Sequence, residues 1–185
     1  HGSYTLILVP LYHSVGFGPN ITVDGARHVY NVMGPRAVSD GVPDFGSEAY
    51  FTEMQRHEFS HSFINPLTEQ HWVIAEPYFE AYGSPVEAQE IANESIVRAV
   101  TTWLAYSKSD EAGDEALQRE LDRGFVLVAP LLEELRGYEA ARDIYASLNE
   151  IYPRLLRVFE GHEPRRYTDR STAEPITPVT PDIKQ

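Results

Sequence analysis

The chain has no cysteine among its 185 residues. This absence excludes disulfides, thiolate zinc fingers and a cysteine nucleophile. Any metal ion would therefore have to be bound by His, Asp or Glu side chains. A cysteine-free chain suits an oxidising compartment without requiring one.

Positive charge and long apolar runs are also scarce. The chain has 15 Lys and Arg residues and 28 Asp and Glu residues, which gives a formal net charge of −13. Phosphate backbones need clustered Lys and Arg, so we expect no nucleic-acid partner. No apolar run approaches the roughly 18 residues of a membrane-spanning helix, so we predict no transmembrane segment.

The remaining composition is that of a folded domain. Hydrophobic residues make up 42% and aromatic residues 11% of the chain, enough to build a core. We expect one domain over residues 1–162. Residues 163–185, with four prolines, form a Pro/Thr-rich tail that we expect to be extended or mobile. The chain opens at His1 without an initiator methionine, so we expect that a segment upstream of the domain is missing.

Strand patterns come first along the chain. Residues 4–34 contain two β-rich, apolar or alternating segments around a Gly/Pro-rich stretch, which predicts two or three antiparallel strands. The Asp24-Gly25 pair is a turn signal. Residues 39–46 are rich in Gly, Pro and Asp and predict a loop.

Helical patterns follow. Ser47 is a good N-cap, and Pro66 is expected to end the helix that begins there. Residues 67–83 show no single pattern of helix or strand. A capping box at residues 84–87 begins a second helix that extends to about Tyr106. The polar stretch "SKSDEAGDE" predicts a break, followed by helices over 114–136 and 138–159. The predicted fold class is α+β, with a small antiparallel sheet followed by about four helices.

The segment "RHEFSHSFINP" carries the clearest chemistry. On a helix, His57 and His61 are about 40° apart around the axis and one turn apart along it, so both can bind one metal ion. Glu58 projects about 100° further round, where it can act as a general base on a metal-activated water. This is the His-Glu-x-x-His pattern of zinc peptidases. The simpler interpretation is a buried face with structural histidines, because Tyr50 and Ile64 share their stripe.

The segment does not supply a third ligand. The long metzincin form requires Gly at position 64 and His at position 67, whereas this chain has Ile64 and Leu67. A downstream glutamate is the usual alternative. The candidates are Glu76, Glu80, Glu87 and Glu94. Spacing alone leaves Glu80 and Glu94 open, although Arg98, one turn after Glu94, could hold its carboxylate.

A family resemblance bears on this choice. "HEFSHSFINP" followed by "NESIVRAV" resembles the gluzincin branch of zinc metallopeptidases. It resembles more closely a bacterial domain-of-unknown-function family in that branch, usually found in exported proteins. "YEAARDIYASLNEIYPRLL" resembles the last helical segment of that family, and the resemblance covers most of residues 5–160. It implies a zincin-like fold, a Zn²⁺ cofactor, Glu94 as third ligand and a secreted or periplasmic location.

The expected function is hydrolysis of a peptide or protein substrate by a zinc metallopeptidase. A donor should also stabilise the oxyanion, and Tyr138 is our first candidate ahead of His71, Tyr82 and Arg142. In zincins generally an exposed edge strand pairs with extended substrate, and the early strands are the candidates for this role. The alternative is a zincin-like metal-binding domain that is inactive or acts on a non-peptide substrate.

Overall fold

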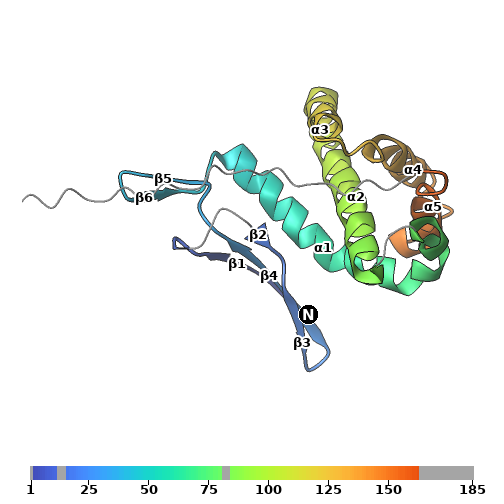
Figure 1. The fold of residues 1–185 in the computed structure, drawn as a ribbon, viewed down its shortest axis with the longest axis horizontal. Helices are drawn as coiled ribbons and strands as arrows, with labels where there is room; N and C mark the ends of the chain where they lie inside the picture. Colours follow the sequence, from blue (N-terminus) through green and yellow to red (C-terminus); the bar gives the residue numbers. More distant parts are fainter. Residues whose placement is uncertain (1, 12–15, 81–83, 163–185) are drawn as a thin grey trace, which may run out of the picture.

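The computed structural model describes residues 2–11, 16–80 and 84–162. Strands come first and helices follow, so the fold is α+β as the sequence predicts (Figure 1). The strands are β1 (Ser3–Leu8), β2 (Gly16–Phe17), β3 (Asn20–Val23), β4 (Ala26–Met33), β5 (Ala37–Ser39) and β6 (Val42–Asp44). The helices are α1 (Glu48–Ala75), the 3₁₀ helix η1 (Glu76–Phe79), α2 (Pro85–Tyr106), α3 (Asp110–Asp122), α4 (Val128–Ala140) and α5 (Leu148–Arg157). The predicted tail, residues 163–185, lies outside the described residues.

Strand β4 is the centre of the main sheet. β3 pairs with it antiparallel through the predicted turn, where Asp24 and Gly25 have φ angles of 50° and 75°. β2 pairs antiparallel with the far end of β4 in the same register. β2 and β3 therefore act as one interrupted strand along one edge of β4.

The other edge of β4 corrects the prediction. β1 pairs with β4 in the parallel direction, with Ser3 opposite His28 and Leu8 opposite Met33. The expectation of an antiparallel arrangement throughout was wrong. Residue patterns report which face of a strand is buried and not its direction. β1 and β2 lie on opposite edges of β4, and only residues 9–15 join them, so β1 ends near the end of β4 where β2 begins. Because β2 is antiparallel to β4, β1 is then parallel to it.

The predicted loop at residues 39–46 is instead a short hairpin. β5 and β6 pair antiparallel across Asp40 and Gly41, whose φ angles are 51° and 76°. Positive φ at both central residues is the geometry that joins twisted strands through two residues. The Asp-Gly signal was therefore present, but three-residue strands are too short for a sequence pattern to show.

Helix α1 begins as predicted but does not end at Pro66. The Ser47 hydroxyl accepts a hydrogen bond from the Tyr50 amide at 3.3 Å, which caps the first turn. Pro66 lies inside the helix, which continues to Ala75. An interior proline loses one backbone hydrogen bond and costs about 3 kcal/mol. The prediction of a helix end was wrong because it ignored what the second half of the helix packs against.

The turn around Pro66 is held by α5. The Tyr152 hydroxyl donates to the Ile64 carbonyl at 3.2 Å and lies 2.6 Å from the Thr68 hydroxyl. Tyr152 is fully buried. After the proline, Trp72 and Ala75 are buried in the same core. This burial and these hydrogen bonds offset the local cost of the proline.

Helix α2 follows the prediction closely. The Ser84 hydroxyl accepts from the Glu87 amide at 3.4 Å, Pro85 occupies the first helical position, and the helix ends at Tyr106. Its apolar side, with Ala92 and Ile96 fully buried, packs into the core.

The C-terminal part contains three helices where the sequence predicted two. α3 begins inside the predicted polar break, because the Ser109 hydroxyl caps it by accepting from the Ala112 amide at 3.1 Å. The predicted helix over 114–136 is interrupted at Gly124, whose φ of 92° suits glycine best. The predicted helix over 138–159 is interrupted by residues 141–147. Amphipathic spacing continues across these breaks, so periodicity alone joined the separate helices.

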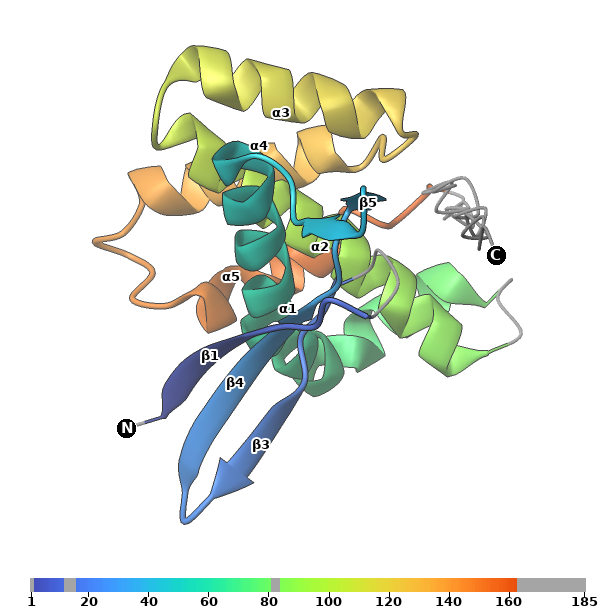
Figure 2. The ribbon, with the colours of Figure 1, turned by 90° about the vertical axis from the view of Figure 1, so that its left-hand side faces the viewer.

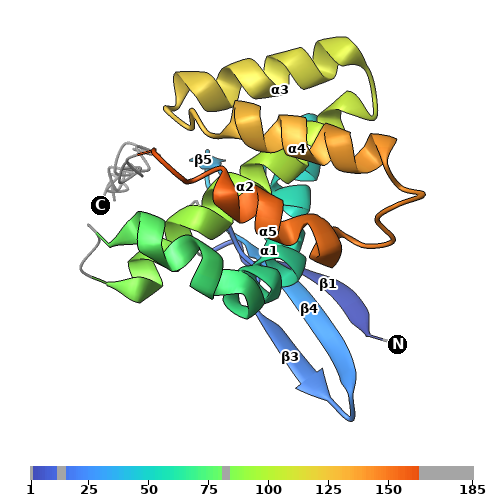
Figure 3. The ribbon, with the colours of Figure 1, turned by 90° about the vertical axis from the view of Figure 1, so that its right-hand side faces the viewer.

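Helix α1 lies between the sheet and the other helices (Figure 1). Figure 2, viewed from the sheet, shows the strands in front of α1, and Figure 3 shows α4 and α5 on the opposite side. The largest fully buried side chains come mainly from α2, α4 and α5, and include Ile96, Leu131, Leu135, Tyr152 and Phe159. Trp72 is buried in this core, whereas Trp103 is partly buried against it. No helix among the described residues is long and apolar enough to span a bilayer.

Candidate metal centre

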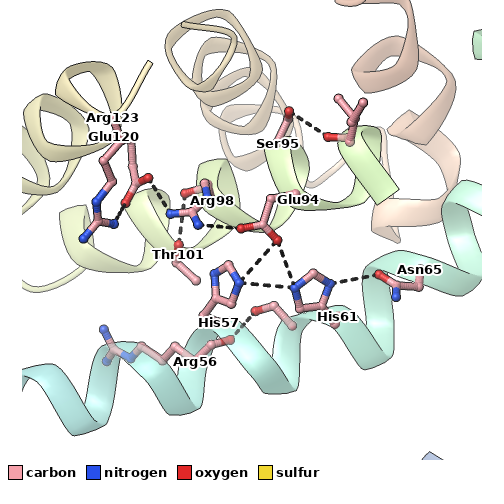
Figure 4. Close-up of polar contacts among 12 residues, drawn as sticks. Arg56, His57, His61, Asn65, Glu94, Ser95, Arg98, Thr101, Glu120 and Arg123 are labelled. Atoms are coloured by element: carbon pink, nitrogen blue, oxygen red, sulfur yellow. Dashed lines mark hydrogen bonds and ion pairs between the residues drawn. The ribbon is translucent and has the colours of Figure 1, made fainter. Parts of the chain in front are cut away.

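Two adjacent helices bring three potential ligands to one point. His57 and His61, one turn apart on α1, face Glu94 on α2 (Figure 4). The Nε2 atoms of the two histidines are 3.2 Å apart. The Glu94 Oε2 atom lies 3.5 Å from Nε2 of His57 and 3.4 Å from Nε2 of His61.

These separations match the requirements of a small tetrahedral metal site. Ligand bonds of about 2.0–2.1 Å at tetrahedral angles place neighbouring donor atoms about 3.3–3.4 Å apart. The three measured separations bracket that value. Among the described residues, this is the one group of three His, Asp or Glu side chains whose donor atoms lie within 4.8 Å of one another. The group could therefore hold a metal ion.

The structure decides among the glutamates that the sequence left open. Glu94 joins the two histidines, whereas Glu76 and Glu80 are exposed residues of the segment after α1 and are not part of the group. The carboxylate of Glu94 is 28% exposed, so a water or a substrate can approach it. One side of the three-residue group thus remains accessible.

Polar partners fix the orientation of each ligand. The Nδ1 atom of His61 is 3.1 Å from Oδ1 of Asn65, and this contact orients the ring so that its Nε2 points towards Glu94. The second oxygen of Glu94 accepts from Arg98 at 2.5 Å, as the sequence predicts. Figure 4 shows both contacts on the outer side of the group.

The chain of ionic contacts extends to a third helix. Arg98 also donates to Glu120 of α3 at 2.7 Å, and Glu120 accepts from Arg123 at 2.9 Å. The Arg98 guanidinium stacks over the Phe125 ring at 3.9 Å. Sequence reasoning missed both Asn65 and Glu120. The i+4 spacing from His61 could have suggested Asn65, but no local pattern connects Glu120 with Arg98.

Burial and charge act in opposite directions on the ligands. Burial alone would raise the pKa of Glu94, but the histidine hydrogen bonds and the Arg98 charge lower it far below its ordinary value. Burial alone would lower the pKa of His61, but its contacts with Glu94 and Asn65 raise it. The carboxylate is therefore held ionised, which is the form that binds a cation.

Glu58 lies beside the group and not within it. Its residue is 7% exposed, and burial raises the pKa of its carboxyl above the ordinary value, while the charges of His57 and His61 act in the opposite direction. A raised pKa makes the Glu58 carboxylate a stronger proton acceptor than an ordinary glutamate.

Strand β2 passes directly over Glu58. A Cβ atom at Gly16 would lie 3.0 Å from Oε1 of Glu58, and one at Gly18 would lie 2.5 Å from its backbone oxygen. Only glycine permits so close an approach at position 18, because the contacted atom is backbone. The sheet is thereby fixed against the helix at the residue that follows His57.

A cleft of about 470 Å³ borders two of the three ligands, His61 and Glu94. His61 and Asn65 of α1 line it together with residues from the first half of α2. The metal-binding group is therefore at the wall of a space that can admit a small group of a ligand.

Tyr138 and His71, two of the oxyanion candidates, make contacts away from the metal-binding group. Tyr138 is buried in the core, and its hydroxyl accepts a hydrogen bond from Arg142, whose guanidinium lies over its ring. His71 is 2.8 Å from Oδ1 of Asn149 and stacks on Tyr152. Tyr82 lies outside the described residues. The catalytic role of Tyr138 stays a prediction, and its contacts support a packing role.

The comparisons with known proteins identify a family but no characterised relative. Neither a search of curated proteins nor a search of solved structures found a match. One family model matches residues 1–158, which include every strand and helix described above. The chain therefore belongs to the family described as Domain of unknown function (DUF4932).

Proposed function

We propose that the protein is a zinc-dependent metallopeptidase of the gluzincin type. The observation that carries this proposal is the tetrahedral spacing of the His57, His61 and Glu94 donor atoms, with Glu58 beside them. Two imidazoles and one carboxylate are a donor set of catalytic zinc sites, which keep a fourth position open. A secreted or periplasmic location belongs to the proposal through the family resemblance.

Each residue has a defined role in the proposed hydrolysis. A bound zinc ion supplies a Lewis acid that polarises a peptide carbonyl and makes a water easier to deprotonate. Glu58 accepts the proton as the water oxygen attacks the carbonyl carbon. It then delivers that proton to the amine nitrogen as the C–N bond breaks. Asn65 and Arg98 hold His61 and Glu94 in position.

In this proposal, the peptide substrate binds along an edge of the main sheet. The interrupted strand formed by β2 and β3 pairs with β4 on one side, and no described strand pairs with its other side. An extended peptide can hydrogen-bond to such an edge. Because Gly16 and Gly18 contact Glu58, a peptide on this edge would run close to the base.

Metal analysis is the first test. Protein purified without a nickel column should contain about one zinc per chain. His57→Ala and Glu94→Ala should both abolish that zinc. Absence of zinc binding by the wild-type protein would refute the proposal.

Hydrolysis is the second test. A peptide-library digest should yield products that disappear when a chelator is added. Glu58→Gln should retain zinc and lose at least about a hundredfold in rate, because it removes the base and leaves the ligands. Full activity in Glu58→Gln would refute the role of Glu58. Stoichiometric zinc with no cleavage of any peptide would favour the alternative of an inactive or non-peptide-directed domain.

A further inference from the structure

The cleft beside the metal-binding group has a distinct chemical character. Besides His61 and Asn65, its wall contains Glu87, Glu90, Ile91 and Asn93 of α2. Residues 87, 90, 91 and 94 are three or four apart, so they form one face of the helix. Within residues 2–11, 16–80 and 84–162, no lysine or arginine lines the cleft.

Asn93 indicates that the cleft is a binding site and not only an acidic surface. The residue is 9% exposed, and its Oδ1 atom is buried without a hydrogen-bond partner among the described residues. A buried acceptor with no partner is unfavourable in a folded protein. A ligand that brings a hydrogen-bond donor into the cleft would satisfy it.

The wall combines oxygen acceptors with an apolar side chain. Glu87 and Glu90 are exposed residues whose positions border the opening, whereas Ile91 is half-buried between the acidic positions. An acidic rim with an apolar surface complements a side chain that has an aliphatic stem and a cationic end. Lysine and arginine have this construction.

A second metal ion fits this cleft less well. Among the described residues, the group formed by His57, His61 and Glu94 is the one set of three donors close enough to share an ion. Glu87 and Glu90 do not form such a set. The surplus of negative charge, −13 in total, also favours cationic peptides during encounter.

We propose that this cleft is the specificity subsite of the enzyme and binds a lysine or arginine side chain of the substrate next to the cleaved bond. Glu90 and Glu87 attract the cationic end, the amide oxygen of Asn93 accepts a hydrogen bond from it, and Ile91 contacts the aliphatic stem. This inference rests on the proposed peptidase function, because it assigns the substrate class of the same site.

Binding of matched zinc-directed probes tests the subsite without relying on catalysis. The probes are the hydroxamates of N-acetylated lysine, norleucine and glutamate, which share a metal-binding group and differ in one side chain. Their dissociation constants for the zinc-loaded full chain can be measured by calorimetry. We expect the lysine compound to bind about fivefold to tenfold more tightly than the norleucine compound, and the glutamate compound to bind most weakly.

Variants locate the preference in the cleft. Glu90→Gln should reduce the lysine-over-norleucine ratio severalfold, and Asn93→Ala should weaken the lysine compound while leaving the norleucine compound unchanged. Glu115→Gln is the matched control, because it changes net charge equally at an exposed position of α3. It should leave the ratio unchanged. Equal affinity for the lysine and norleucine compounds on zinc-loaded protein would overturn the inference.

The two proposals fail in different ways. If the wild-type chain binds no zinc, the proposed function fails and the subsite loses its basis. If zinc is bound and all three hydroxamates bind equally, the subsite alone is wrong. In a peptide-library digest, cleavage beside lysine and arginine supports the subsite, whereas cleavage without basic preference contradicts it and leaves the peptidase proposal intact.

Discussion

The two halves of α1 make polar contacts of opposite character. Before Pro66, His57 and His61 meet the ionised carboxylate of Glu94 in a group whose side chains are 15–28% exposed. After it, Thr68 meets Tyr152 in a fully buried, uncharged pair that also satisfies the Ile64 carbonyl. One helix thus presents an accessible ionic group to α2 and a sealed hydrogen-bonded contact to α5.

The first half of α1 therefore serves metal binding, whereas the second half serves the stability of the fold. A buried pair contributes to folding because losing one partner leaves the other unsatisfied. An accessible group of ligands can exchange its contacts for a metal ion, since its members are held in place by Asn65 and Arg98 and not by the core. Mutations on the two halves should therefore change different measurements.

The largest expected effect is on metal affinity. Glu94→Ala should weaken zinc binding at least about a hundredfold, because it removes one of three ligands. The free energy of unfolding of the metal-free protein should fall by about 1–2 kcal/mol, because the histidines and Arg98 lose the carboxylate whose pKa they lower, although Arg98 keeps its partner Glu120. Competition with a fluorescent chelator and urea unfolding measure the two quantities. A large loss of metal-free stability would show that the ligands belong to the folding core.

Loss of the buried Thr68–Tyr152 contact should lower stability and leave zinc affinity unchanged. Tyr152→Phe should reduce the free energy of unfolding by about 1–3 kcal/mol, because the Thr68 hydroxyl and the Ile64 carbonyl lose their shared partner. Zinc affinity should stay within about twofold of wild type. A double-mutant cycle with Thr68→Val, followed by urea unfolding, isolates the coupling. No measurable coupling would contradict the importance assigned to this pair.

An orienting residue should have an intermediate effect on metal binding. Asn65→Ala should weaken zinc binding about tenfold, because His61 loses the contact that sets its ring orientation. The effect on unfolding should be under about 0.5 kcal/mol, since Asn65 is exposed. Asn65→Asp keeps an acceptor and should restore most of the affinity. Unchanged zinc affinity in Asn65→Ala would show that packing alone orients the ring.

The smallest effect is expected at the residue between the two halves. Pro66→Ala should stabilise the protein by about 1 kcal/mol, because alanine restores an amide donor inside the helix. Zinc affinity should not change. Urea unfolding and zinc titration provide the measurements. Destabilisation would mean that the packing of α5 depends on the proline ring.

Local features of the fold were readable from the sequence. Ser47, Ser84 and the Asp24-Gly25 turn act through residues three or four positions away at most, and the structure confirms all three. The predictions that were wrong concern longer distances. Pro66 stays within a helix because α5 packs against the next turn, and β1 runs parallel to β4 because a short segment joins it to the antiparallel β2 on the opposite edge.

In the candidate site, too, local spacing predicted some features and the packing of helices decided the others. The sequence by itself determined that His57 and His61 share one helix face with Glu58 beside them, because a spacing of four residues on a helix places both histidines on the same side. Only the tertiary structure decided which glutamate completes the group, that Glu120 anchors Arg98, and that α2 borders a cleft with an unpartnered amide in its wall. Those relationships join helices that are distant in sequence, and no local periodicity specifies how two helices pack.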